Sequence, residues 1–160
     1  MEDNEYVNTV AKYADVVYRV AYSYCKLSYD ADDVLQNTFL KLLQTETDFK
    51  DDEHIRKWLI RVAVNECKNL FSSFWRGKIG SLETLDIEPV FLKKEENELY
   101  EVVKQLPKKY KIVVHLFYYE GYATAEIAQI LHMKETTVRT QLVRARKRLK
   151  QQLKEAWYDE

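Results

Sequence analysis

A cluster of threonine, glutamine and basic side chains near the C-terminus has the chemistry needed to bind DNA. Hydroxyl, amide and guanidinium groups can hydrogen-bond to base edges, and lysine and arginine also bind phosphates. The apolar residues Val138, Leu142, Ala145 and Leu149 step by four, three and four residues, which predicts one helix with an apolar face. The opposite, polar face would carry Thr137, Thr140, Gln141, Arg144, Lys147 and Arg148, with Arg139 on its flank.

A shorter helix is predicted just before this one, joined to it by a tight turn. The hydroxyl of Thr124 is expected to cap its first turn. Its apolar face would be formed by Ile127, Ala128, Ile130 and Leu131. Two short helices around a turn form a helix-turn-helix, whose second helix enters the major groove. A basic face alone is more often an ordinary solvated helix surface, but the paired helices of Tyr122–Leu153 favour DNA binding.

The distribution of charge predicts two contacts with nucleic acid. The net charge is only −1, yet the charges are segregated along the chain. Residues 1–55 carry 12 acids and 5 bases, and residues 82–103 carry 7 acids and 2 bases. Residues 56–81 carry 6 bases and 1 acid, and residues 104–154 carry 12 bases and 3 acids. The basic blocks suit phosphate, whereas the acidic blocks would repel it and are expected to face another partner.

Length and composition favour a small helical protein. The chain has 160 residues, 46% of them hydrophobic, and only three Gly and two Pro, which argues against a sandwich or barrel. Two Gly, Pro89 and no sustained period mark a linker between residues 76 and 96. We therefore predict an all-α fold of two small helical domains joined by a flexible linker. The domains would be residues 1–76 and 96–160, with the acidic linker at 77–95.

The first half predicts three helices. The first spans Glu5–Leu27, and the second is DADDVLQNTFLKLLQ, for which Asp30 is the expected N-cap. The third helix, Ile55–Phe74, is basic and follows a polar loop, Thr45–Glu53, that contains Phe49. Basic groups beside an aromatic loop are typical of a platform for single-stranded DNA, although composition alone leaves ordinary solvation equally open.

The helices expected in the second half precede the helix-turn-helix. Asn97–Leu106 is stopped by Pro107, and Lys108–Tyr119 ends at Gly121, which suits a left-handed C-terminal cap. The inward side of the second helix would carry Ile112, Val113, Leu116 and Phe117.

Nothing in the sequence predicts a catalytic, cofactor or metal site. Three scattered His and no nucleophile–base spacing argue against a helical enzyme. Cys25 and Cys67 lack a CxxC spacing, so we expect reduced thiols, each in a core, rather than a zinc site. No run approaches the roughly 20 apolar residues of a membrane span, and the acidic N-terminus does not resemble a signal peptide. These features favour the cytoplasm.

Four blocks of this chain resemble the extracytoplasmic-function class of the sigma-70 family. They are DADDVLQNTFLKLLQ, RKWLIRVAVNECKN, LPKKYKIVVHLFYYEGYATAEIA and TTVRTQLVRARKRL, in the family's order and over almost the whole chain. The resemblance implies a non-catalytic promoter-recognition subunit of RNA polymerase. A stand-alone helix-turn-helix regulator is the alternative, but it would have no need for the acidic DADD helix or the second basic block.

The resemblance implies a role for three sets of residues. Docking on the clamp of the polymerase β′ subunit would involve Asp32, Asp33, Gln36 and Lys41. Capture of the −10 element as single-stranded DNA would involve Phe49, Lys50, Arg56, Lys57, Arg61, Asn65 and Lys68, with Trp58 structural. Base contacts in the −35 duplex would come from Thr136, Thr137, Arg139, Thr140, Gln141 and Arg144. Phosphate contacts there would come from Arg146, Lys147 and Arg148.

The resemblance also implies partners. They are core RNA polymerase, through the β′ clamp and the β flap, promoter DNA, and an anti-sigma factor. Anti-sigma factors of this class are often membrane-anchored, so the chain would be sequestered at the membrane. The sequence departs from the family at Asn37, where Glu is frequent, at His132 and Thr136, where Gly is frequent, and at Lys134, where a Ser cap is usual.

Overall fold

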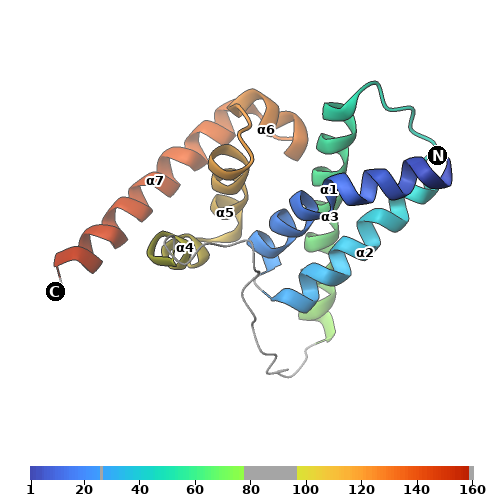
Figure 1. The fold of residues 1–160 in the computed structure, drawn as a ribbon. Helices are drawn as coiled ribbons and strands as arrows, with labels where there is room; N and C mark the ends of the chain where they lie inside the picture. Colours follow the sequence, from blue (N-terminus) through green and yellow to red (C-terminus); the bar gives the residue numbers. More distant parts are fainter. Residues whose placement is uncertain (26, 78–96, 159–160) are drawn as a thin grey trace. The chain divides into compact units, whose positions relative to one another are not determined.

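Two helical units make up the protein (Figure 1). The computed structural model describes residues 1–25, 27–77 and 97–158, and every regular element within these ranges is a helix. The chain divides into the units Met1–Ile87 and Glu88–Glu160. The predicted all-α fold with two small helical domains is therefore confirmed. Apart from Gly77, the predicted linker lies outside the described residues, so its boundaries stay predictions.

The first unit is a bundle of three helices. α1 (Asp3–Cys25), α2 (Ser28–Gln44) and α3 (Asp52–Gly77) each contact the other two. Each helix contributes fully buried apolar side chains to one core, among them Val17, Val20, Val34, Leu42, Leu59 and Ile60. Burying one such side chain contributes about 1.5–3 kcal/mol, so apolar contact between the helices holds this unit together.

The start of α2 differs from the prediction. α2 begins at Ser28, and its N-cap residue Leu27 makes no side-chain cap. Instead, the N–H of Ala31 donates to the carbonyl of Leu27 at 3.1 Å. The prediction of Asp30 as N-cap is wrong, because the earlier start places the fully buried Ala31 inside the helix. Asp30 lies in the first turn, where the helix dipole still favours a carboxylate.

The second unit is built around its last and longest helix, α7 (Glu135–Tyr158). α4 (Asn97–Lys104), α5 (Lys108–Val114) and α6 (Thr124–Leu131) all contact it. A π-helical turn, His115–Tyr119, directly follows α5. The apolar stripe predicted for α7 is buried at three of its four positions, which are Val138, Leu142 and Ala145.

The helix-turn-helix is set by two left-handed residues. Gly121 has φ 75°, as expected for a residue that ends a helix, and His132 between α6 and α7 has φ 55° and ψ 50°. A left-handed non-Gly residue costs about 1–2 kcal/mol, so the contacts around this turn must hold His132 in place.

Thr124 does not cap α6. Ala123 is the N-cap residue, and its N–H donates to the carboxylate of Glu126 at 3.1 Å. The hydroxyl of Thr124 instead donates to Oε1 of Glu135 in α7, at 3.0 Å. The predicted cap is therefore wrong, because this threonine ties the two helices of the motif to each other.

Candidate nucleic-acid interfaces

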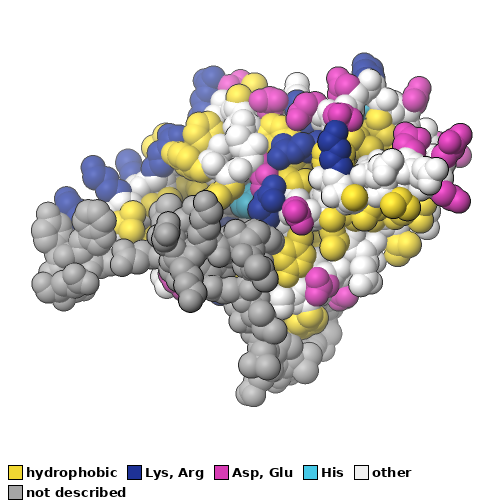
Figure 2. All heavy atoms as spheres, in the orientation of Figure 1, with side chains coloured by type: hydrophobic (Ala, Val, Ile, Leu, Met, Phe, Trp, Pro, Cys, Tyr) yellow, Lys and Arg dark blue, Asp and Glu magenta, His cyan; other side chains and the backbone are white. Residues whose placement is uncertain are grey.

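The solvent-facing side of α7 carries the core of the predicted −35 set. Because its apolar stripe is buried, the opposite side of the helix is exposed. Figure 2 shows Lys and Arg side chains along the edge of the molecule that α7 occupies. The exposed members of the predicted set on this side are Thr136, Thr137, Thr140, Arg144 and Lys147. These side chains combine hydroxyl donors with positive charge, the chemistry that duplex DNA requires.

Two of the predicted base-contacting residues are placed differently. Nη2 of Arg139 donates to Oε1 of Glu135 at 2.6 Å, an ion pair one helical turn apart. Gln141 is only half-exposed, and its Oε1 is buried without a hydrogen-bond partner in the described part of the chain. Arg139 would therefore have to leave Glu135, and Gln141 would have to turn outward, before either could reach a base.

Aromatic side chains support two of the predicted phosphate contacts. Nε of Arg146 donates to the hydroxyl of Tyr118 at 2.7 Å, and its guanidinium lies 5.5 Å from the ring centre of Phe117. The guanidinium of Arg148 lies 5.3 Å from the ring centre of Tyr110. Such cation–π contacts hold an arginine in place while leaving N–H groups for a ligand. The sequence analysis did not predict these rings as part of the interface, since nothing in the spacing pairs them with α7.

In the first unit, the predicted −10 loop presents an aromatic ring that rests on other rings. The loop is shorter than predicted because α3 already begins at Asp52. The ring centre of Phe49 lies 5.4 Å from that of Trp58 and 5.2 Å from that of His54, both in edge-to-face geometry. Phe49 and Trp58 are both half-buried. The loop thus holds an aromatic face that is partly open to a ligand.

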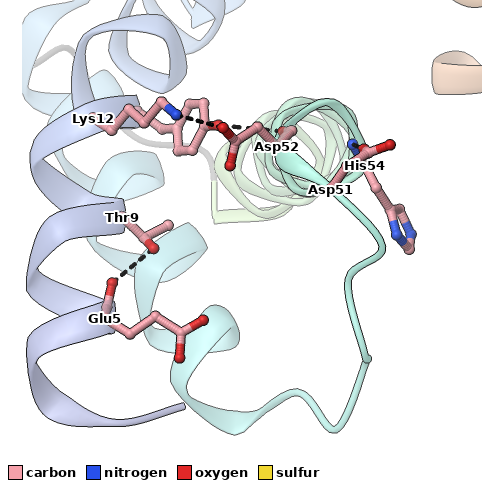
Figure 3. A network of polar contacts seen from close by, with 7 residues as sticks. Glu5, Thr9, Lys12, Asp51, Asp52 and His54 are labelled. Atoms are coloured by element: carbon pink, nitrogen blue, oxygen red, sulfur yellow. Dashed lines mark hydrogen bonds and ion pairs between the residues drawn. The ribbon is translucent and has the colours of Figure 1, made fainter.

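His54 is a loop-organising residue that the sequence analysis did not predict. The N–H of Lys50 donates to Nδ1 of His54 at 3.0 Å, and the N–H of His54 donates to Oδ1 of Asp51 at 2.7 Å. Figure 3 shows the imidazole pointing away from α1, on the outer side of the loop. Together with the contact to Phe49, these bonds hold the backbone that directly follows the aromatic residue.

Two residues of α1 fix the start of α3, next to this loop (Figure 3). Nζ of Lys12 lies 2.7 Å from Oδ2 of Asp52, and the hydroxyl of Tyr13 donates to the carbonyl of Asp52 at 3.2 Å. The hydrogen bond to Asp52 raises the pKa of the Lys12 ammonium. A hollow of about 730 Å³ lies beside these contacts, lined by α1, the end of α2 and the loop. α1 therefore helps to position the predicted −10 loop.

The predicted DNA-contacting residues of α3 divide into two groups. Lys57, Arg61, Asn65 and Lys68 follow one another at spacings of four, four and three, which places them on one helical face. The last three are exposed. Lys57 and its neighbour Arg56 are half-buried, and each makes contacts within the chain. The outer group can approach a nucleic-acid backbone directly, and the inner group lies nearer the loop.

The outer face of α2 is acidic and, in addition, apolar. Asp32, Asp33 and Gln36 are exposed, as a docking surface requires. Leu40 and Leu43 continue this face and are 52% and 53% exposed. They were not predicted, although the run LKLL contains more apolar residues than one buried stripe needs.

Lys41, the fourth predicted docking residue, pairs with a neighbouring helix. Its Nζ lies 2.5 Å from Oε1 of Glu66 in α3, whose side chain is largely buried. This pair joins α2 to α3. Lys41 therefore stabilises the packing of the bundle, whereas the other three residues of the predicted set are exposed on its surface.

The two cysteines are free thiols. Cys67 is buried, as predicted, whereas Cys25 is only half-buried, and the two form no disulfide. No group of three or more His, Cys, Asp or Glu that could hold a metal ion occurs among the described residues. The helices described here include none that is long and apolar enough to cross a membrane.

Both units match known families. The family descriptions "Sigma-70 region 2" and "Sigma-70, region 4" match residues 9–77 and 96–149, and together they cover most of the chain. The chain belongs to the sigma-70 family. It is thus an alternative RNA polymerase sigma factor, and the matches do not favour a stand-alone regulator.

Individual relatives agree with this assignment. The RNA polymerase sigma factor SigV of Bacillus subtilis is 28% identical over 92% of this chain and 90% of its own length. The sigma factor SigM of Mycobacterium tuberculosis is 29% identical over 83% of this chain and 69% of its own length. The fold is similar to that of the sigma factor RpoE in its complex with the anti-sigma factor NepR from Bartonella quintana. That similarity has a TM-score of 0.77 at 18% identity, over 94% of this chain and 97% of RpoE.

Proposed function

We propose that this sigma factor binds core RNA polymerase, directs it to promoters with −35 and −10 elements, and assists their melting. The observation that carries the proposal is that each sigma region forms its own unit with its own basic surface. One surface adjoins an aromatic loop and the other lies on a helix-turn-helix. The chain itself would catalyse no step, since melting is driven by selective binding of the open strand.

Docking would use the outer face of α2. Leu40 and Leu43 provide the apolar centre that protein interfaces favour, and Asp32, Asp33 and Gln36 provide a polar, acidic edge. A basic surface on the β′ clamp would complement these carboxylates and guide the encounter. The role of Lys41 is then indirect, because its pair with Glu66 keeps α2 seated on α3.

Promoter melting would depend on the loop in front of α3. Unstacking a base costs a few kcal/mol, and stacking it on an aromatic side chain recovers about 1–3 kcal/mol. Phe49 is half-exposed and makes an edge-to-face contact with Trp58, so it can provide that stacking surface. Lys50 and the outer residues of α3 would bind the phosphates of the same strand. The open strand would thereby be stabilised relative to the duplex.

The −35 element would be bound as duplex by the exposed side of α7. Thr136, Thr137 and Arg144 would contact bases without prior rearrangement. The hydroxyl of Thr140 donates to the carbonyl of Thr136 at 2.9 Å, so it would accept from a base or rotate before donating to one. Contacts to phosphate would come from Arg146, Lys147 and Arg148, which set the register on the duplex but carry no sequence information.

An anti-sigma factor is the proposed regulator. RpoE of Bartonella quintana, which shares the fold, was solved in complex with the anti-sigma factor NepR. A protein of this kind that covers α2 would compete with the polymerase for the same exposed leucines and carboxylates. The sigma factor would act in the bacterial cytoplasm and be held at the membrane when its inhibitor is anchored there.

The decisive experiment is reconstitution with core RNA polymerase, followed by run-off transcription on a genomic library. We expect transcripts from a discrete set of promoters, and Asp32→Arg combined with Asp33→Arg should abolish co-purification with core. The double variant Asp3→Arg, Asp15→Arg is the matched control, because it changes two exposed acids of α1 by the same charge. Normal co-purification of the α2 variant would rule out this docking face.

A further inference from the structure

A hollow of about 210 Å³ lies between α5 and α7, partly outside the helix-turn-helix. We propose that it binds one backbone phosphate of the −35 duplex, and that Lys109 on α5 is a phosphate contact. The residues lining it include Lys109 and Tyr110 of α5 and Thr136, Thr137, Thr140 and Arg144 of α7. The inference rests on the proposed binding of α7 to duplex DNA, and it adds a contact from a helix to which no DNA contact had been assigned.

The charge of the hollow suits an anion. Its lining includes two cations, Lys109 and Arg144, and no carboxylate. Both cations are exposed, and Arg144 forms no ion pair within the described residues. Nζ of Lys109 lies 5.1 Å from the ring centre of Tyr110, a residue that is itself buried. The lysine is thus supported at the rim, where its ammonium remains available to a ligand.

The neutral groups of the hollow are donors that phosphate oxygens accept. The hydroxyls of Thr136 and Thr137 lie on the exposed side of α7. Gln141 also lines the hollow, and its buried Oε1 has no partner among the described groups. This oxygen is an acceptor and cannot bond to a phosphate oxygen, but rotation of the amide would turn its NH₂ group, which donates, toward a bound phosphate.

Geometry favours a phosphate over a base edge. In a helix-turn-helix complex the second helix lies in the major groove, and the neighbouring helices meet the backbone at the groove wall. Lys109 belongs to such a neighbour, yet it shares a hollow with the face that would enter the groove. A lysine is a compact point charge that suits a phosphate oxygen, and it need not match the planar pattern of a base.

The test uses holoenzyme reconstituted with core and a promoter duplex recovered in the run-off experiment. Lys109→Gln should lower the slope of log K against log salt by about 0.9, the value expected for one phosphate contact. Its deficit in affinity should therefore be roughly threefold larger at 50 mM than at 200 mM salt. Lys109→Gln should lose the same factor in affinity on a duplex with a scrambled −35 element, because a phosphate contact does not depend on base sequence. Lys109→Arg should restore the slope, and Lys154→Gln, an exposed lysine near the C-terminal end of α7, should leave it unchanged.

The contact can be located on the DNA by replacing single phosphates with neutral methylphosphonates. At one position, we expect the replacement to weaken the wild-type protein but to cost Lys109→Gln nothing further. The inference is overturned if the wild type binds and Lys109→Gln keeps its full salt slope, or if its deficit vanishes on the scrambled duplex. If the wild-type holoenzyme binds the promoter duplex no more tightly than the duplex with the scrambled −35 element, the proposed function itself fails.

Discussion

The predicted −10 loop and the exposed side of α7 suit their proposed forms of DNA in opposite ways. In the loop, Phe49 packs against two other aromatic rings, and hydrogen bonds of His54 hold the backbone that follows it. On α7, Arg144 and Lys147 project from a straight helix and make no ion pair within the described residues. The loop is organised before DNA arrives, whereas Arg144 and Lys147 of α7 are exposed without such support.

The difference follows from the two forms of DNA. A single strand is flexible, so the protein must supply the geometry that holds an unstacked base. A duplex is already rigid and presents its groove in a fixed shape, so a helix that carries donors on one side is sufficient. We therefore expect substitutions in the loop to affect both folding and binding, whereas substitutions on α7 should affect binding alone.

Phe49→Ala should have the largest effect. It removes a half-buried ring, which should lower the stability of the first unit by about 1–3 kcal/mol. It also removes a stacking surface worth about 1–3 kcal/mol per base. Thermal unfolding and binding of single-stranded −10 oligonucleotides by holoenzyme measure the two losses. Phe49→Leu should recover most of the stability but not the binding. If this leucine variant bound the strand normally, Phe49 would not be the stacking surface.

Arg144→Ala should affect binding without affecting folding. It should weaken the −35 duplex by about 1–3 kcal/mol and leave the melting temperature of the protein unchanged. Arg139→Ala is the matched comparison, since Arg139 is paired with Glu135 and must break that pair before it can reach DNA. Its loss of affinity should be the smaller of the two. Equal losses would show that the pair with Glu135 does not restrain Arg139.

Periodic features were predictable from the sequence. Val138, Leu142 and Ala145 are buried as their spacing indicated, and Gly121 has the left-handed conformation expected of it. These features depend on neighbours within one or two helical turns, so the sequence itself contains the information. The domain roles and the individual DNA contacts stay predictions, because their evidence lies in complexes with other molecules.

Features that depend on competition between contacts were not predictable. Asp and Thr are both favoured as N-cap residues, yet neither Asp30 nor Thr124 is the N-cap of its helix. In the first case α2 begins two residues before Asp30, and in the second Glu135 of another helix accepts the hydrogen bond of the threonine hydroxyl. The support of Arg146 by Tyr118 joins residues 28 positions apart, a separation for which no periodic pattern exists.

The smallest effect is expected at His54, where the ring and the acceptor can be removed separately. His54→Phe keeps an aromatic edge against Phe49 but removes the acceptor for the N–H of Lys50. His54→Asn places Oδ1 where Nδ1 was, so it keeps the acceptor and loses the ring. One hydrogen bond contributes about 0.5–1.5 kcal/mol, so amide exchange at Lys50 should accelerate by up to about tenfold in the Phe variant.

In the Asn variant, exchange at Lys50 should stay near the wild-type rate. The affinity of holoenzyme for the −10 strand should follow the same order, because a looser backbone must be fixed again when the base binds. Wild-type exchange in both variants would mean that the loop is held by its aromatic contacts alone. The loop would then differ from α7 in its aromatic packing but not in how firmly its backbone is held. Phe49 would account for the whole contrast between the two surfaces.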